Sequence, residues 1–219
     1  MKSIKGVIWD VDGTLADTLG LCVTSLQAAI GSVGGPSMSE DEVKATFGPT
    51  EEGILEGLVG DRWEDAFNIY LEMYERAHDA EALVFSDVVE EVRRLADAGI
   101  PQSVVTGKGM ASAEITLTHI GAEGAFDQVA AGSDKGSVKA VEIARITHQW
   151  GFDPNEVVYI GDHDSDVTHA RKAGAVAVSA AWAPGTDVEA IELVEPDAIL
   201  FNADQLAHWL NAHIAGLTS

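Results

Sequence analysis

Cationic side chains, cysteine and long apolar runs are all scarce in this chain of 219 residues. Only 13 lysines and arginines stand against 36 aspartates and glutamates, which gives a formal net charge of −23. A surface of that sign repels nucleic-acid phosphates and anionic lipid, so we expect neither nucleic acid nor a membrane as a partner. Any site that handles phosphate must therefore supply its own positive charge, from a lysine or a metal ion.

The single cysteine, Cys22, cannot form a disulfide within the chain, so the sequence does not depend on an oxidising compartment. No run approaches the roughly 18 consecutive apolar residues that a membrane span requires. The first residues also lack the apolar core of a secretory signal. We therefore expect a cytoplasmic location. Apolar residues still make up 46% of the chain, which favours a packed core over disorder.

From about residue 83 onward, short apolar runs alternate with stretches that have the periodicity of amphipathic helices. Near-continuous apolar strands that alternate with helices are typical of a parallel sheet covered on both faces. We therefore predict an α/β fold, a doubly wound parallel sheet with a Rossmann-like core. The predicted strands are residues 5–9, 100–105, 128–131, 157–160, 176–180 and 198–200, and the predicted helices of this part are residues 88–98, 110–120, 138–150, 165–173 and one capped by Asn202.

The stretch between the first strand and residue 83 has only helical patterns, which predict helices at residues 17–30, 40–47, 52–58 and 62–77. An all-helical stretch that interrupts an alternating series after its first strand indicates an inserted domain. We predict that residues 1–15 and 83–219 form the Rossmann-like catalytic core. Residues 16–82 then form an inserted α-helical cap domain.

Polar side chains follow three of the predicted strands, at the positions where ligands bind in an open α/β sheet. Each group alone also fits a surface turn or the start of a loop. Three such groups after strands of one sheet favour a site, because all three positions agree. The groups are Asp10-Val11-Asp12-Gly13-Thr14, Thr106-Gly107-Lys108, and Gly161-Asp162 followed by Asp166.

These residue types fit phosphoryl transfer. A carboxylate at a strand end, such as Asp10, can attack phosphorus and form an acyl phosphate. Asp12 lies two residues on, close enough to protonate a leaving oxygen and later to deprotonate water. Asp10 and Asp162 can supply the oxygen ligands that Mg²⁺ takes from carboxylates beside a substrate phosphate. We therefore expect Mg²⁺ as the cofactor.

Four further residues are candidates for binding the phosphate group. Gly13 allows the backbone to turn sharply beneath it, and we include Thr14 beside it. Thr106 and the backbone N–H of Gly107 can donate hydrogen bonds to phosphate oxygens. A lysine would supply the remaining positive charge on the transferring oxygens.

The three groups resemble the motifs of the haloacid dehalogenase superfamily, in its phosphoglycolate phosphatase-like branch with a helical cap after the first strand. The resemblance covers nearly the whole chain. It implies that Asp10 is the nucleophile and that Asp12 is the general acid and base. It also implies that Asp10, the carbonyl of Asp12 and Asp162 hold Mg²⁺, with Asp166 acting through water or beside these ligands.

The lysine motif of the family departs from its usual form here. Many relatives have a Lys-Pro-x-Pro sequence, whereas this chain reads Gly132-Ser133-Asp134-Lys135-Gly136-Ser137-Val138-Lys139. We favour Lys135, because Lys-Gly before a helix is the commoner substitute and lies nearer the strand end. Lys139 sits at the usual distance from Asp127 and stays an alternative. On this assignment, Lys135→Ala lowers turnover by orders of magnitude and Lys139→Ala has a mild effect.

The cap carries two acids, Glu51 and Glu52, in a loop of the kind that such caps lower over the site. They either contact a polar substrate or complement the dipole of a helix that starts there, and we favour the second interpretation.

The leading functional prediction is a Mg²⁺-dependent phosphatase that hydrolyses a small phosphorylated metabolite, such as phosphoglycolate or a sugar phosphate, through a phosphoaspartyl intermediate. A phosphomutase of the same superfamily is the alternative among enzymes. A phosphate-holding regulator of the receiver type is the alternative from another class, although the nucleophile on the first strand and the cap insert disfavour it. We expect a monomer or a homodimer.

Overall fold

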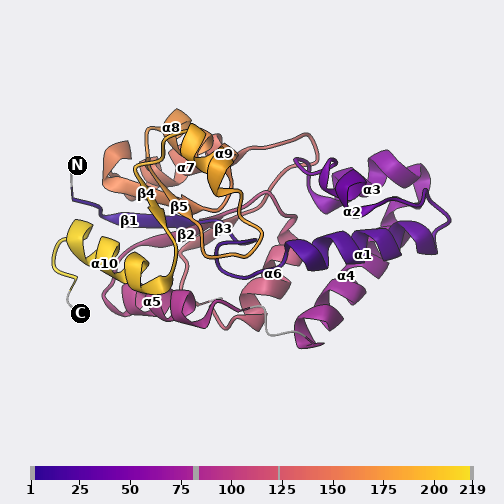
Figure 1. Cartoon of the computed structure of the whole chain (residues 1–219), viewed down its shortest axis with the longest axis horizontal. Helices are drawn as coiled ribbons and strands as arrows, with labels where there is room; N and C mark the ends of the chain where they lie inside the picture. The colour runs from indigo at the N-terminus through magenta and orange to yellow at the C-terminus, as the bar shows by residue number, and fades with distance from the viewer. Residues whose placement is uncertain (1–2, 81–83, 123, 218–219) are drawn as a thin grey trace.

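The computed structural model describes residues 3–80, 84–122 and 124–217, and within them a six-stranded parallel sheet forms the centre of the molecule (Figure 1). Its strands are β1 (Gly6–Trp9), β2 (Gln102–Val105), β3 (Gln128–Ala130), β4 (Val157–Gly161), β5 (Val176–Ala180) and β6 (Ala198–Leu200). The strand order is β3-β2-β1-β4-β5-β6. The order reverses beside β1, which confirms the predicted doubly wound sheet and places the topological switch point between β1 and β4.

Alternate side chains of the central strands enter two separate apolar layers, as the two-residue repeat of a strand requires. Val7 and Trp9 of β1 and Val158 of β4 are buried in one layer. Ile8 of β1 and Tyr159 of β4 are buried in the other. A strand buried on both faces has no need of polar positions, which explains why these strands read as continuous apolar runs.

Helices cover both faces of the sheet (Figure 1). Two of them, α5 and α10, pack on the first apolar layer. Two others, α7 and α8, pack on the second. The helices of the core are α5 (Ser86–Asp97), α6 (Met110–His119), α7 (Lys139–Trp150), α8 (Asp164–Ala173), α9 (Val188–Leu193) and α10 (Ala203–His213), with a 3-10 turn at Pro154–Glu156.

Four helices between β1 and α5 extend away from the sheet (Figure 1). They share a hydrophobic cluster of their own, with Leu26, Leu55, Tyr70 and Tyr74 fully buried in it. Ile115 of α6 packs against this cluster from the core side. The predicted return of the chain to the core, at residues 82 and 83, lies outside the described residues. The four helices are α1 (Leu19–Ser32), α2 (Glu40–Lys44), α3 (Glu51–Val59) and α4 (Trp63–Ala80), with a 3-10 turn at Gly60–Arg62.

Helix ends follow the capping chemistry of the sequence. The side chain of Asn202 accepts a hydrogen bond from the backbone N–H of Gln205, which confirms Asn202 as the cap of α10. Gln205 Oε1 accepts from the backbone N–H of Phe201, one residue before the cap, so the reciprocal bond differs from that of a capping box. Helix α2 ends at Lys44, three residues earlier than predicted, before the loop that contains Gly48 and Pro49.

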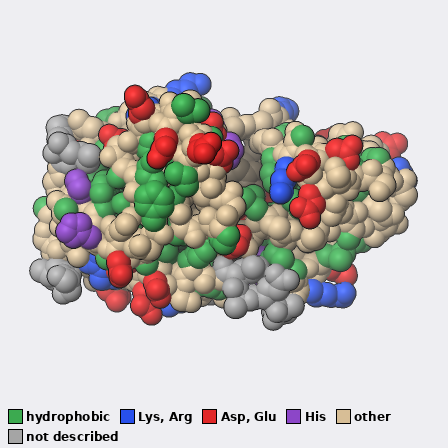
Figure 2. Space-filling model, viewed as in Figure 1, with side chains coloured by type: hydrophobic (Ala, Val, Ile, Leu, Met, Phe, Trp, Pro, Cys, Tyr) green, Lys and Arg blue, Asp and Glu red, His purple; other side chains and the backbone are tan. Residues whose placement is uncertain are grey.

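The face drawn in Figure 2 has acidic side chains over both the sheet-containing part and the four-helix part, with fewer lysines and arginines. Among the described residues, no helix combines the length and the apolar character needed to cross a membrane.

Candidate active site

Three loops meet at one edge of the sheet, because β2, β1 and β4 are neighbours and all run in the same direction. These loops and the segment of helices α1–α4, called the cap below, line an open cavity of about 640 Å³. Its core lining includes eight residues from the loops and from the starts of α7 and α8. They are Asp10, Asp12, Thr106, Gly107, Lys108, Lys139, Asp162 and His163.

The loop after β1 turns tightly beneath the cavity. Gly13 has a φ of +70°, and a Cβ atom added to it would lie 2.0 Å from Oδ2 of Asp162. Only glycine satisfies both conditions without displacing the carboxylate. Thr14 does not line the cavity, and its buried hydroxyl oxygen has no hydrogen-bond partner. The geometry therefore gives Gly13 a place beside the acidic residues and gives Thr14 none beside a substrate.

Three carboxylates converge at the end of the sheet. Asp10, Asp162 and Asp166 each offer an oxygen atom, and these atoms lie within 4.8 Å of one another. Asp10 and Asp166 are 6% and 1% exposed, so water screens their mutual repulsion little. Oxygen atoms at this spacing suit a hard divalent cation.

Lys139, the first residue of α7, is the cation in contact with this cluster. Its Nζ lies 2.5 Å from Oδ2 of Asp10 and 2.6 Å from Oδ1 of Asp166. Lys135, in contrast, lies in an exposed turn and does not line the cavity. The geometry therefore favours Lys139 over Lys135 as the lysine of the site, which reverses the preference drawn from the sequence. The physical reason is that α7 begins at Lys139 and directs its first side chain back toward the end of β1.

Burial and charge repulsion raise the pKa values of Asp10 and Asp162 when no cation is bound. Burial raises the pKa of Asp10 to about 6, although Lys139 acts in the opposite direction. Burial, together with Asp166 and Asp10, raises the pKa of Asp162 well above its ordinary value. Burial alone would lower the pKa of Lys139, but Asp10 and Asp166 hold it well above the ordinary lysine value. The cluster therefore has more negative charge than one lysine offsets.

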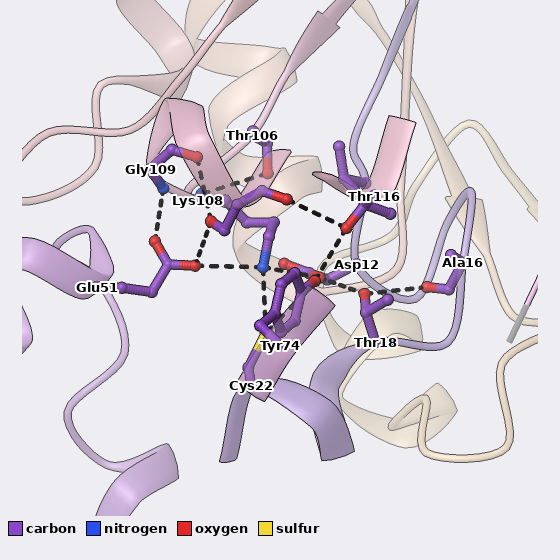
Figure 3. A network of polar contacts seen from close by, with 12 residues as sticks. Asp12, Ala16, Thr18, Cys22, Glu51, Tyr74, Thr106, Lys108, Gly109 and Thr116 are labelled. Atoms are coloured by element: carbon purple, nitrogen blue, oxygen red, sulfur yellow. Dashed lines mark hydrogen bonds and ion pairs between the residues drawn. The ribbon is translucent and has the colours of Figure 1, made fainter. Parts of the chain in front are cut away.

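A second lysine, Lys108, lies beside Asp12 (Figure 3). Its Nζ is 3.4 Å from Oδ1 of Asp12, 3.2 Å from Oε1 of Glu51 and 3.1 Å from Sγ of Cys22. The same Asp12 oxygen accepts a hydrogen bond from the hydroxyl of Thr18, just before α1. Burial opposes the charge of Lys108, but Asp12 leads the groups that raise its pKa well above the ordinary value.

Glu51 of the cap is buried, and four groups donate hydrogen bonds or charge to its carboxylate. They are the backbone N–H of Gly109 at 2.6 Å, the Ser112 hydroxyl at 2.7 Å, the Tyr70 hydroxyl at 3.0 Å and Lys108. Burial would raise the pKa of Glu51, but Lys108 and the hydrogen bonds from Gly109 and Ser112 lower it. Glu51 is the first residue of α3, as the helix-dipole interpretation expects, yet its contacts cross from the cap to the core.

The sequence analysis assigned no role to Lys108. It also did not predict that Glu51 contacts the core. Lys108 was visible as the residue after Thr106-Gly107, at the end of a strand that carries two other site residues. No local pattern links residues 51 and 108, because the contact depends on how the cap docks. Thr106 and Gly107 line the cavity as predicted, and the Thr106 hydroxyl accepts a hydrogen bond from the backbone N–H of Lys108.

Fold and site together are those of an α/β enzyme with a cluster of carboxylates at the end of its first strand. The family model described as haloacid dehalogenase-like hydrolase matches residues 7–180, and the chain belongs to this family. It is a hydrolase of the family's phosphatase branch.

Individual relatives and solved structures match most of the chain. A pyrophosphatase PpaX from Bacillus velezensis is 25% identical over 211 residues, which cover 94% of this chain and 96% of the relative. A tyrosine-protein kinase PtkA from Mycobacterium tuberculosis is 30% identical over 187 residues, which cover 84% of this chain and 64% of the relative. The crystal structure of a predicted phosphoglycolate phosphatase from Haemophilus somnus has a TM-score of 0.78 at 20% identity, covering 95% of this chain and 99% of that one. This last similarity shows the fold.

Proposed function

We propose that this protein is a Mg²⁺-dependent phosphatase that hydrolyses a small phosphorylated metabolite through a phosphoaspartyl intermediate on Asp10. The observation that carries the proposal is the position of Asp10. Its carboxylate ends the central strand, contacts the Lys139 ammonium at 2.5 Å and faces a cavity that the cap also lines. A buried carboxylate beside a cation, at the switch point of the sheet, is placed to attack an incoming phosphate.

The donor set fits a magnesium ion. Asp10, Asp162 and Asp166 offer three carboxylates within 4.8 Å, against the single ammonium of Lys139. We propose that Asp10, Asp162 and the backbone carbonyl of Asp12 hold Mg²⁺, and that Asp166 assists from beside them while orienting Lys139. When bound, the ion offsets the negative charge of the phosphoryl oxygens as the nucleophile approaches.

The reaction proceeds in two displacements at phosphorus. A carboxylate oxygen of Asp10 forms a bond to phosphorus while the bond to the ester oxygen breaks, and Asp12 gives that oxygen its proton. Asp12 then takes a proton from water as the water oxygen attacks phosphorus. The bond between phosphorus and Asp10 breaks, which releases inorganic phosphate and restores the enzyme.

The remaining site residues bind and orient the transferring group. Lys139, the Thr106 hydroxyl and the Gly107 N–H are donors on the core side of the cavity, where the phosphoryl oxygens lie. Fixed donors of this kind provide most of the catalysis in phosphoryl transfer. The cap excludes bulk water while the ester is in place.

The cavity favours a small leaving group. Its volume of about 640 Å³ has to hold both the phosphate and the leaving alcohol, and its cap side includes Leu19, Leu26, Phe47 and Ile54. Phosphoglycolate, sugar phosphates and pyrophosphate are the substrates to try first, since relatives named for two of these share the fold or the sequence. A mutase of the same superfamily would return the phosphate to a second hydroxyl instead of releasing it.

The test is phosphate release from a panel of these compounds, with Mg²⁺ and with EDTA, by the wild type and by Asp10→Asn. We expect multiple turnover that requires the metal and falls by at least about 10³-fold in Asp10→Asn, because the amide cannot form the acyl phosphate. Asp97→Asn, at an exposed position at the end of α5, is the matched control and keeps full activity. A folded wild type that releases no phosphate from any compound would refute the proposal, and isomerised sugar phosphate in its place would indicate the mutase.

A further inference from the structure

A lysine from the core is enclosed by the cap beside the proposed general acid. The side chain of Lys108 is only 3% exposed. Three of its neighbours come from the cap: Cys22 from α1, Glu51 from α3 and Tyr74 from α4. The centroid of the Tyr74 ring lies 4.4 Å from Nζ of Lys108. Three different cap helices thus surround one core ammonium (Figure 3). The core contributes its fourth partner, the carboxylate of Asp12, at 3.4 Å.

A buried ammonium is stable only where carboxylates and dipoles replace its lost hydration. Lys108 satisfies this condition by lying between one carboxylate of the core and one of the cap. If the cap moved away, the Glu51 carboxylate, the Cys22 sulfur and the Tyr74 ring would all leave together, and water would reach the ammonium. The buried contact between Lys108 and Asp12 therefore exists as observed only while the cap is docked.

The carboxylate of Glu51 is bound by hydrogen-bond donors of the core. The backbone N–H of Gly109 and the hydroxyl of Ser112, at the start of α6, both donate to its carboxylate. The N-terminus of a helix attracts an anion through its unpaired N–H groups and its dipole, so the start of α6 binds the Glu51 carboxylate in a defined position. Backbone contact between Thr50 N–H and the carbonyl of Ser133, at 3.1 Å, fixes the same segment of the cap.

We propose that Lys108 is a positioning residue that fixes the carboxylate of Asp12 for proton transfer, and that Glu51 makes this contact conditional on a docked cap. The inference rests on the proposed function, because it assigns a task to the acid of that reaction. Cap closure and correct placement of the acid become a single event. An ester that prevents the cap from docking would then meet a poorly placed acid.

The leaving group distinguishes this role from a structural one. An alkyl oxygen needs a proton to depart, whereas 4-nitrophenolate departs without one. We therefore compare kcat/KM for the best alkyl phosphate of the panel with kcat/KM for 4-nitrophenyl phosphate, in the wild type and in Lys108→Met. This ratio includes only the steps up to the phosphoenzyme, so hydrolysis of the intermediate does not affect it.

We expect Lys108→Met to lower kcat/KM about 10²-fold for the alkyl phosphate, the usual size of a general-acid contribution, and less than about 3-fold for the aryl phosphate. Glu51→Gln keeps the length of the side chain and an oxygen for Gly109 while removing the charge that holds Lys108. We expect Glu51→Gln also to lower kcat/KM more for the alkyl phosphate than for the aryl phosphate, but by a smaller factor than Lys108→Met. Lys5→Met, at a half-exposed lysine paired with Glu156, is the matched control and changes neither ester.

Equal losses for the two esters in a folded Lys108→Met or Glu51→Gln variant would overturn the inference, since a general loss of cap packing affects both reactions alike. Unchanged kcat/KM for both esters would overturn it as well. A wild type that hydrolyses neither ester would instead refute the proposed function, and with it the inference. Circular dichroism and thermal unfolding establish which variants are folded, and Glu51→Gln carries the test if Lys108→Met is not.

Discussion

At the scale of single residues, the two buried lysines divide the site between them. Lys139 contacts Asp10 and Asp166, and Lys108 contacts Asp12 and Glu51. One ammonium thus lies with the proposed nucleophile and the proposed metal-binding carboxylates, while the other lies with the proposed acid and the cap. In a chain with so few cations, two lysines whose side chains are only 3% and 12% exposed and paired with acids are candidates for a functional role.

Exchange of each candidate lysine for methionine separates the two assignments of the lysine motif. We expect Lys139→Met to lower phosphate release by about 10²–10³-fold, because it removes a fixed charge from the transferring oxygens. Lys135→Met, in the exposed turn, should retain activity within about 2-fold. Initial rates under Mg²⁺ saturation measure both. The opposite ranking, in two folded variants, would restore the assignment of Lys135.

This pair of lysines shows what the sequence cannot decide. The motif residues Asp10, Asp162 and Thr106 were predictable, because each directly follows an apolar strand whose end fixes its position. The lysine follows a segment of irregular backbone between Ala130 and α7, and residue spacing does not determine the path of such a segment. Only the start of α7 shows that residue 139, not residue 135, faces Asp10.

At the scale of elements, the turn after β1 is the most constrained. Gly13→Ala places a methyl group where the Asp162 carboxylate lies and forces a side chain into a positive φ. We expect a destabilisation of about 1–3 kcal/mol and strongly weakened Mg²⁺ dependence of turnover, because Asp162 must move. Thermal unfolding and a magnesium titration of phosphate release measure the two effects.

Gly20→Ala is the matched control for this substitution. Gly20 lies in α1, and an added Cβ would meet nothing within 4 Å. Alanine should therefore stabilise the protein slightly, by up to about 1 kcal/mol, through its better helix propensity. Full activity and metal dependence in Gly13→Ala would show that the turn can relax without moving Asp162.

Elements were predictable from the sequence where an apolar pattern was long. The strands of the core and the helices of both parts lie within a few residues of their expected positions, because their buried faces dictate the pattern. Helix α9 was not predicted: it spans only Val188–Leu193, and Leu193 within it is 84% exposed. A short helix with one buried position, Ile191, leaves no periodic signal.

At the scale of the whole molecule, negative charge dominates the protein, and part of it lies in the acidic cluster at the end of β1. The formal net charge is −23. Within the acidic cluster, Asp10, Asp162 and Asp166 lie together with Lys139 as their contacting ammonium. This arrangement would repel a dianionic phosphate, so under the proposed function we expect phosphate binding as well as turnover to depend on a bound cation.

The same charges predict how metal binding and stability depend on pH. Without a cation, burial raises the pKa of Asp10 to about 6, and the pKa of Asp162 also lies well above its ordinary value. Between the ordinary and the raised pKa, the folded state binds more protons than the unfolded state, so the free energy of unfolding falls as pH rises through this range. Mg²⁺ binds the deprotonated carboxylates and counteracts the loss. We therefore expect Mg²⁺, relative to EDTA, to raise the Tm clearly at about pH 8 and little at about pH 5.

Asp162→Asn, which removes one of the proposed ligands, should reduce this shift in Tm at the higher pH. An equal shift at both pH values would mean that the ion binds away from this cluster.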